Sequence, residues 1–172
     1  MFKNINMRRL YTILLAAAVL CTSCIKDREK GADLAVGDVI PDFKVTMNDG
    51  STVNSGQLRS GISCIVFFTT VCPDCRETLP HVQRLYDEYM PQGVTFALIS
   101  RAETEETVAP HWESEGFTMP YSPQKDRSVY ELFASSRIPR VYICKDGVIR
   151  AIFTDTPANP TYEDMKAVIE EL

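Results

Sequence analysis

The length, composition and charge of the chain indicate one acidic globular domain. It has 172 residues, of which 45% are hydrophobic, and both values are ordinary for a single compact domain. The formal net charge is −5, and loss of the leader described below would leave 15 basic residues against 23 acidic ones. A surface this acidic argues against nucleic acid or an anionic membrane surface as the binding partner.

The first 23 residues have the pattern of a bacterial secretory leader. Basic residues precede an apolar run, Leu10 to Leu20, which is too short to span a bilayer comfortably. These basic residues are Lys3, Arg8 and Arg9. We therefore expect residues 1–23 to be an export signal, with an uncleaved signal anchor as the alternative. Both place the domain outside the cytoplasm.

Small residues directly before a cysteine mark the end of this run. Thr22 and Ser23 precede Cys24, and the arrangement resembles the lipobox at which the leader is cut off and the cysteine is lipidated. Cys24 is therefore the predicted lipid attachment site. Cys21 is disfavoured, because Leu20 would then occupy a position where the signal peptidase needs a small residue.

Residues 24–35 are predicted to be the lipid attachment segment and a flexible tether, and residues 36–172 the folded domain. The stretch Ile25 to Leu34 is polar, charged and without periodicity, which is typical of a disordered spacer. The chain is thus expected to be a lipoprotein of the bacterial cell envelope. Its domain would lie in the periplasm, with the cell surface as an alternative.

The domain is predicted to open with a β-hairpin followed by a buried strand. Val39 to Met47 and Ser51 to Val53 flank an Asn48-Asp49-Gly50 turn, whose residues suit the positive φ angles of tight turns. The run Ile62 to Thr69 is almost entirely apolar and rich in β-forming residues. It therefore predicts a central strand that is buried on both faces.

Helices and strands alternate in the rest of the chain. Apolar residues recur at helical spacing from Pro73 to Tyr89, with Pro80 expected to kink the helix. The later predicted elements are a strand at Val94 to Ser100, a helix at Glu103 to Glu115 capped by Thr104, a helix at Ser128 to Ser135, a hairpin of Val141 to Cys144 and Val148 to Phe153, and a helix at Thr161 to Leu172. This order predicts an α/β fold with a mixed central sheet and helices on both faces.

Two of the cysteines form a C-x-x-C motif, Cys72-Pro73-Asp74-Cys75, at the junction of the central strand and the first long helix. Cys72 falls at the helix cap with Pro73 in the first turn, so the free N–H groups and the helix dipole should stabilise its thiolate. Cys75 lies nearly one turn deeper. We therefore expect Cys72 to be the nucleophile and Cys75 the resolving thiol of a redox pair that needs no other cofactor.

Alternative roles for the cysteines remain open. A static disulfide or half of a zinc site is the alternative for the C-x-x-C pair, although no second cysteine or histidine pair has ligand spacing. Cys64 and Cys144 stand on apolar strands and are expected to be core residues. A contact between these two across the sheet is also possible.

Several features around the motif are similar to one known group of proteins. They are the stretch Gly37 to Phe43, Phe67-Phe68 before the motif, Pro80 five residues after Cys75, and Ile138-Pro139 before the strand Val141 to Ile143. With these features the sequence resembles, from Val36 to Leu172, the TlpA/ResA-like group of the thioredoxin superfamily, which is related to the AhpC/TSA proteins. The resemblance implies a thioredoxin fold with an N-terminal hairpin and an inserted strand and helix at Val94 to Glu115.

The resemblance also implies roles for residues near the motif. Pro139 would be cis and lie beside Cys72, and the backbone of Ile138 would pair with an extended substrate segment. The protein would reduce disulfides of protein substrates, apocytochrome c among the candidates, with electrons from a membrane thiol carrier. The sequence alone leaves the direction of electron flow open, because it depends on local fields.

Three positions depart from the pattern of this group. Val71 stands where many relatives carry Trp, Val66 replaces the buried carboxylate of thioredoxins, and Thr78 replaces a frequent Glu. The proton donor is therefore open. Asp74 and Glu77 are the candidates, and the alternative is that they are ordinary acids in the first turn of a helix.

Two rival functions come from other classes. Thr69 to Cys72 partly resembles the T-x-x-C motif of thiol peroxidases, with Arg137 or Arg140 as a second element. A copper chaperone would use the two thiolates and His111 as ligands, since soft thiolates suit Cu(I). The spacing in the C-x-x-C motif is not the usual one for copper chaperones.

Overall fold

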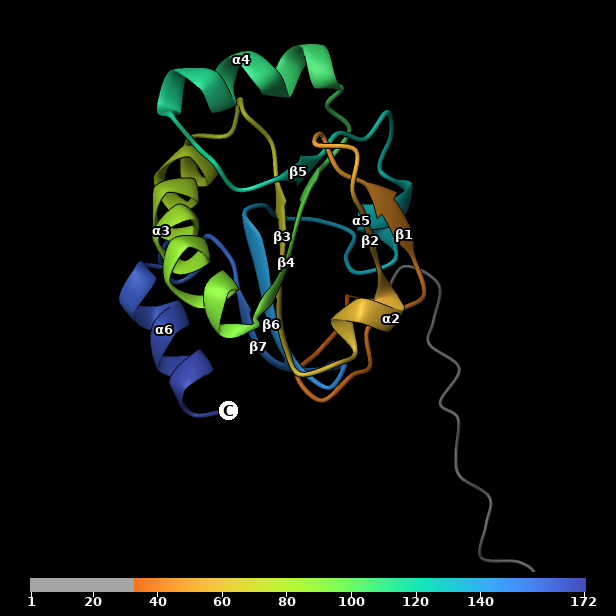
Figure 1. The fold of residues 1–172 in the computed structure, drawn as a ribbon, viewed down its shortest axis with the longest axis vertical. Helices are drawn as coiled ribbons and strands as arrows, with labels where there is room; N and C mark the ends of the chain where they lie inside the picture. The colour runs from red at the N-terminus through yellow and green to blue at the C-terminus, as the bar shows by residue number, and fades with distance from the viewer. Residues whose placement is uncertain (1–32) are drawn as a thin grey trace, which may run out of the picture. The chain divides into compact units, whose positions relative to one another are not determined.

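The computed structural model describes residues 33–172, which form a five-stranded mixed sheet, a separate two-stranded hairpin and the helices around them (Figure 1). The predicted leader, the lipid attachment site Cys24 and most of the predicted tether lie outside the described residues. Within residues 33–172, no helix is long and apolar enough to span a bilayer.

Packing begins upstream of residue 36, where the domain was expected to start. The side chain of Leu34 is buried, and its backbone N–H donates to the carbonyl of Phe133 at 2.8 Å. The tether therefore ends earlier than its polar composition predicted, because Leu34 has an apolar site to fill.

The N-terminal hairpin is present but shorter than predicted. Strands β1 (Lys44–Thr46) and β2 (Thr52–Asn54) pair in an antiparallel manner, and Gly50 in the turn between them has a φ of +81°. A short helix, α2 (Ser55–Leu58), follows directly. It was not predicted, although Asn54 and Gln57 form a capping box at its start.

The central sheet has the strand order β5-β4-β3-β6-β7. Strand β3 (Ile62–Phe68) lies in the middle and is buried beyond its first residue, as predicted. It pairs in parallel with β4 (Thr95–Ser100) and in an antiparallel manner with β6 (Arg140–Lys145), which pairs with β7 (Val148–Phe153). The mixed sheet predicted from the alternation of elements is confirmed.

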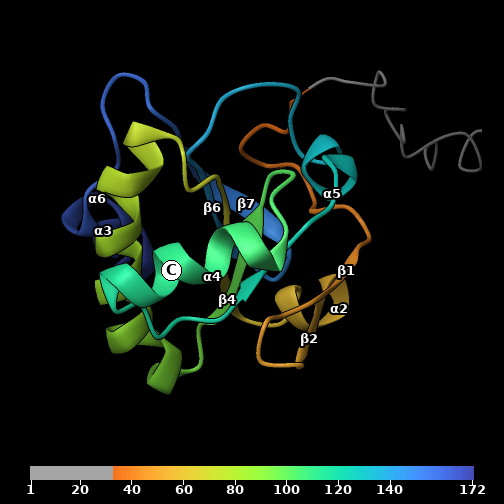
Figure 2. The same cartoon turned by 90° about the horizontal axis from the view of Figure 1, so that it is seen from above.

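The helices lie on two sides of this sheet. Helix α3 (Pro73–Tyr89) has the predicted bounds, contains Pro80 and is followed by the 3-10 turn η1 (Met90–Gln92). In Figures 1 and 2, α3 and α6 (Tyr162–Glu170) lie on one side of the sheet, while α2 and the β1–β2 hairpin lie on the other. Helix α4 (Glu105–Glu115) follows Thr104 at its N-cap.

Two further elements differ from the prediction. The α-helix expected at Ser128 to Ser135 is only α5 (Ser128–Glu131). Beyond it, the backbone N–H groups of Leu132 and Phe133 donate to carbonyls three positions back, and that of Ser135 donates to the carboxylate of Asp33 at 2.7 Å. A short edge strand, β5 (Tyr121–Ser122), pairs in parallel with β4 and was not predicted. It stands between two prolines, which favour a loop when the sequence is considered alone.

The isolated cysteines are core residues. Both thiols are fully buried and free. Cys64 is directly opposite Ile143 across the β3–β6 pair, whereas Cys144 is opposite Ser63. Because directly opposed residues point to the same face of a sheet and neighbours alternate, the two thiols point to opposite faces. The cross-strand contact that the sequence left open is therefore not made.

Candidate active site

The two cysteines of the motif stand at the junction of β3 and α3 and are unequally exposed. Cys72 is the N-cap residue of α3, with extended backbone angles, and Pro73 is at the first helical position, as predicted. Cys72 is half-buried, whereas Cys75 is fully buried, and both thiols are free. The outer thiol can reach a partner, while the inner thiol can be reached only through the outer one.

The surroundings of Cys75 favour its protonated form. Burial raises the pKa of the Cys75 thiol well above its ordinary value. A hydrogen bond with the backbone of Thr69 and the positive charge of Arg101 act in the opposite direction but do not outweigh burial. Cys75 is therefore a thiol at neutral pH, and it must lose a proton before it can attack a disulfide.

The loop before β6 meets Cys72 directly. The peptide bond between Ile138 and Pro139 is cis, as expected, and the Sγ atom of Cys72 lies 3.7 Å from the carbonyl oxygen of Ile138. These residues come from chain segments 66 positions apart. The structure thus places the Ile138-Pro139 segment beside the outer thiol.

The two acids near the motif share one partner that sequence reasoning missed. The Nδ2 group of Asn159 donates to Asp74 Oδ1 at 3.1 Å and to Glu77 Oε2 at 2.9 Å. Asn159 lies in the loop between β7 and α6, more than 80 residues from either acid. Asp74 and Glu77 are thus joined on one face of α3 rather than being independent solvated side chains.

A second missed residue, Glu103, supports the loop that leads to Cys72. Its side chain is buried, and its carboxylate accepts hydrogen bonds from the backbone N–H of Thr70 at 2.8 Å and from the Thr70 hydroxyl at 3.0 Å. The carbonyl of Thr70 accepts a hydrogen bond from Arg76 Nε at 2.7 Å. A buried acid is therefore present near the motif, but it comes from the loop after β4 and not from position 66 or 78.

The positions that depart from the family pattern have separate surroundings. Val66 and Thr78 are fully buried, and among the described residues the Thr78 hydroxyl has no hydrogen-bond partner. Val71 is 75% exposed immediately before Cys72. An apolar side chain at this place is available to contact whatever approaches the outer thiol.

The residues that the rival functions require are engaged elsewhere. Arg137 is half exposed and pairs with Asp155, and Arg140 is buried and pairs with Asp33. His111 packs its ring against Trp112 and Phe117. Within residues 33–172, no cluster of three or more histidine, cysteine or acidic side chains is arranged to hold a metal ion.

Comparisons with known proteins agree with this geometry. The Redoxin family model matches residues 35–169. The thiol-disulfide oxidoreductase ResA of Geobacillus thermodenitrificans is 26% identical over 171 residues, which cover 99% of this chain and 97% of the relative. The protein of the same name from Oceanobacillus iheyensis is 28% identical over 137 residues, which cover 77% of this chain and 71% of the relative.

Solved structures establish the fold. A thiol:disulfide interchange protein of the thioredoxin family from Chlorobium tepidum superimposes with a TM-score of 0.67 at 20% identity, over 81% of this chain and 98% of the other. A thiol:disulfide interchange protein from a Bacteroides species gives 0.66 at 21% identity, over 81% and 90%. The chain therefore belongs to the Redoxin family, and within it is a ResA-like thiol-disulfide oxidoreductase of thioredoxin fold.

Proposed function

We propose that this chain reduces protein disulfides outside the cytoplasm, with Cys72 as the nucleophile and Cys75 as the resolving thiol. The observation that carries the proposal is the difference in exposure between the two thiols at the start of α3. A folded substrate can approach Cys72, and Cys75 can attack only a disulfide already formed on Cys72. The helix N-terminus stabilises the Cys72 thiolate.

The exchange proceeds in two steps. The Cys72 thiolate attacks one sulfur of the substrate disulfide, the substrate S–S bond breaks, and the other substrate sulfur leaves as a thiolate that takes up a proton. Cys75 then loses its proton and attacks the Cys72 sulfur, so that the mixed disulfide breaks and the second substrate thiol is released. The substrate gains two electrons and two protons, and the Cys72–Cys75 disulfide holds the oxidising equivalents without another cofactor.

Residues around the pair position the substrate and the proton. An extended substrate segment pairs with the backbone of Ile138 beside Pro139, which brings its disulfide to Cys72. The carboxylates of Asp74 and Glu77, held together by Asn159, are the candidates to accept the proton of Cys75. Pro73 stands at the first helical position, where its missing N–H would have been unpaired in any case.

The predicted export signal supports the location, and the similarity to ResA-like proteins supports the partners. Lipidation at Cys24 anchors the chain to a membrane of the cell envelope, with the domain in the periplasm or at the cell surface. Protein disulfides are the substrates, apocytochrome c among them, and a membrane thiol carrier reduces the Cys72–Cys75 disulfide after each cycle. The acidic chain does not bind nucleic acid.

The reduction potential of the Cys72–Cys75 couple tests the direction of electron flow. The full-length protein is equilibrated against glutathione buffers and its thiols are trapped. A potential close to that of thioredoxin, about −270 mV, is expected for a reductase. A potential close to that of DsbA, about −120 mV, would make the protein a disulfide donor. No reversible couple at all would refute the function.

Trapping of a mixed disulfide tests the roles of the two thiols. Cys75→Ser should accumulate a covalent complex with a protein disulfide substrate, because the resolving step is missing. Cys72→Ser should form none, although it retains Cys75. Equal amounts of complex in both variants would overturn the assignment of Cys72 as nucleophile.

A further inference from the structure

The segment Ser135 to Ile138, just before Pro139, is held by side chains at its first three carbonyl groups. It has no regular secondary structure, and Arg137 within it has a φ of +70°. The carbonyl of Ser135 accepts a hydrogen bond from Arg127 at 2.8 Å, that of Ser136 from Arg140 at 3.0 Å, and that of Arg137 from Tyr130 at 2.8 Å. A loop anchored in this way is ordered before any substrate arrives, and it leads to the Ile138 carbonyl beside Cys72.

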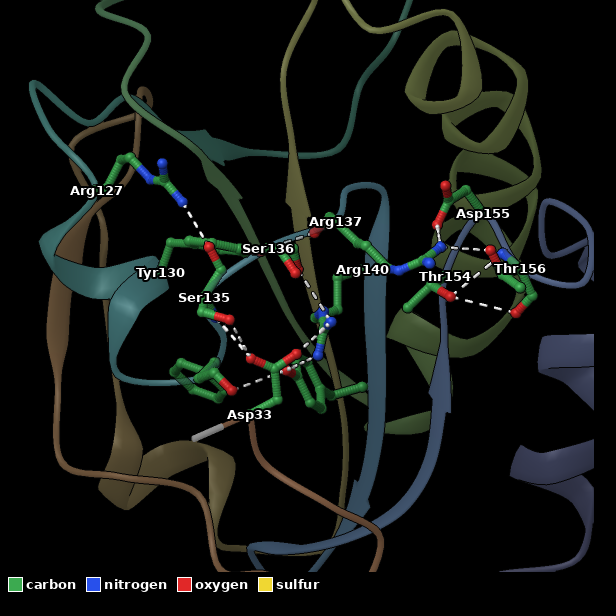
Figure 3. A network of polar contacts seen from close by, with 12 residues as sticks. Asp33, Arg127, Tyr130, Ser135, Ser136, Arg137, Arg140, Thr154, Asp155 and Thr156 are labelled. Carbon is green, nitrogen blue, oxygen red and sulfur yellow. Dashed lines mark hydrogen bonds and ion pairs between the residues drawn. The ribbon is translucent and has the colours of Figure 1, made fainter. Parts of the chain in front are cut away.

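One ion pair, between the buried guanidinium of Arg140 and the partly exposed carboxylate of Asp33, lies at the centre of these anchors. Arg140 is 5% exposed and donates through Nη2 to Asp33 Oδ2 at 2.8 Å and to the carbonyl of Ser136. Asp33 also accepts from the backbone N–H of Ser135 at 2.7 Å and from its hydroxyl at 2.9 Å. Figure 3 shows the carboxylate of Asp33 between Ser135 and the guanidinium of Arg140.

A second anchor holds the same segment from the side of β7. The guanidinium of Arg137 pairs with Asp155 at 3.1 Å and donates to the hydroxyl of Thr156 (Figure 3). Half of the Arg137 side chain is accessible, and exposed pairs contribute little. The guanidinium of Arg140 is buried and donates to both Asp33 and the carbonyl of Ser136, so Arg140 is the anchor on which the position of the segment depends.

Stability alone does not explain this pair. Removing the charge of Arg140 from water is costly, and because Asp33 is partly exposed, its attraction to Arg140 is partly screened by solvent. Among the described residues, the Nε atom of Arg140 is also buried without a hydrogen-bond partner, which adds to the cost. The pair does fix the distance between Arg140, on strand β6, and the residues Ser135 and Ser136.

We propose that Arg140 and Asp33 are positioning residues that hold the Ser135 to Ile138 segment in the conformation that docks protein disulfides. The inference rests on the proposed function and adds to it a structural basis for the binding of protein substrates. Neither residue contacts Cys72 in the structure; they act through Ser135, Ser136 and the segment that ends at Ile138. Because the loop is ordered in advance, a protein substrate does not have to meet the entropy cost of ordering it.

This arrangement predicts a split between large and small substrates. A small disulfide such as glutathione disulfide needs only access to the Cys72 thiolate. A protein disulfide must also lie along the segment next to Pro139. Loosening of the segment should therefore raise KM for a protein disulfide, while the rate with the small disulfide stays near that of the wild type. A merely structural defect would lower both rates together.

The test compares Arg140→Met, which keeps the length of the side chain, with Arg59→Met as the matched control. Arg59 also pairs with an aspartate, Asp42, at 2.7 Å and donates to a backbone carbonyl, that of Ile40, at 2.7 Å. In the full-length protein, kcat and KM are measured with insulin and with glutathione disulfide. Arg140→Met should raise KM for insulin by about tenfold, and change the rate with glutathione disulfide by less than about twofold. Arg59→Met should match the wild type with both substrates.

Asp33→Ala is the second variant, for the case that Arg140→Met does not fold, because about a third of the Asp33 side chain is exposed and Arg140 keeps its bonds to Tyr142 and to the carbonyl of Ser136. It should show the same split. Wild-type KM for insulin in the Asp33 and Arg140 variants, or a parallel loss with both substrates, would overturn the inference while leaving the proposed function in place. If the wild type reduces neither disulfide, the proposed function fails, and this inference fails with it.

Discussion

Glu103 and Thr70 are joined by two hydrogen bonds, at 2.8 Å to the backbone N–H and at 3.0 Å to the hydroxyl of Thr70. The carboxylate is buried, and it reaches from the loop after β4 to the residue two positions before Cys72. A residue outside the motif therefore supports the chain between β3 and α3, just before Cys72.

Glu103→Ala should destabilise the domain markedly. It leaves the backbone N–H of Thr70 buried without an acceptor, and we expect the free energy of unfolding to fall by about 2–3 kcal/mol. Glu103→Gln keeps an acceptor and should cost about 1 kcal/mol. Urea unfolding of the reduced protein measures both. The control is Glu113→Ala, an exposed acid on α4, which should change the value by less than about 0.5 kcal/mol.

Cys75 should react with alkylating reagents only at high pH. In the Cys72→Ser variant, the rate of Cys75 alkylation should rise about tenfold per pH unit up to at least pH 10, because burial raises the pKa of Cys75. An ordinary cysteine reaches a plateau above its pKa of about 8.5. Mass spectrometry after timed quenching gives the rates. A plateau near pH 8.5 would show that Cys75 is not shielded as the structure has it.

Buried thiols should also make the domain less stable in alkaline solution. Burial raises the pKa of Cys144 to about 12, whereas an unfolded cysteine has a pKa of about 8.5. A raised pKa means that the stabilisation is fully present below pH 8.5 and is lost as the pH rises toward 12. Over this range the free energy of unfolding should fall by about 1.4 kcal/mol per pH unit for each such thiol.

Cys144→Ala isolates this contribution. The slope of the free energy of unfolding against pH, measured between pH 9 and pH 10.5 under reducing conditions, should be shallower than that of the wild type by about 1.4 kcal/mol per pH unit. The variant should be less stable at pH 7, because it loses a buried sulfur. An unchanged slope would mean that Cys144 does not titrate differently in the folded and unfolded states.

The bridge from Asn159 to the two acids of α3 should influence the reactivity of Cys72. Asn159→Asp replaces a shared donor by a third negative charge, which disfavours a thiolate nearby, so alkylation of Cys72 at pH 7 should slow by about threefold to tenfold. Glu77→Gln removes a charge and should accelerate it. Both effects should shrink in 0.5 M salt, because exposed charges are screened. Equal rates in the two variants would exclude an electrostatic role for this cluster.

Local sequence determined the elements and the redox pair. The periodicity of Pro73 to Tyr89 predicted the observed bounds of α3, since an amphipathic helix depends on neighbours three and four positions apart. The apolar run predicted strand β3 from adjacent residues alone. The hairpin of β6 and β7 was likewise predicted from nearby residues, among them the Asp146-Gly147 turn. Cys72 at the cap and Pro73 at the first helical position are one local signal, and it was read correctly.

Only the tertiary structure decided what surrounds the pair. Asn159, Glu103 and Asp33 each bond to partners between 33 and 107 residues away, and nothing in their own neighbourhoods marks them. One of these bonds lies just beyond the end of α5, where Asp33 accepts from the backbone N–H of Ser135. Helical and strand propensities depend on adjacent residues, whereas hydrogen-bond partners across the fold depend on which loops the sheet brings together. The sequence could therefore place the C-x-x-C motif at the start of α3 but not identify the distant residues that surround it.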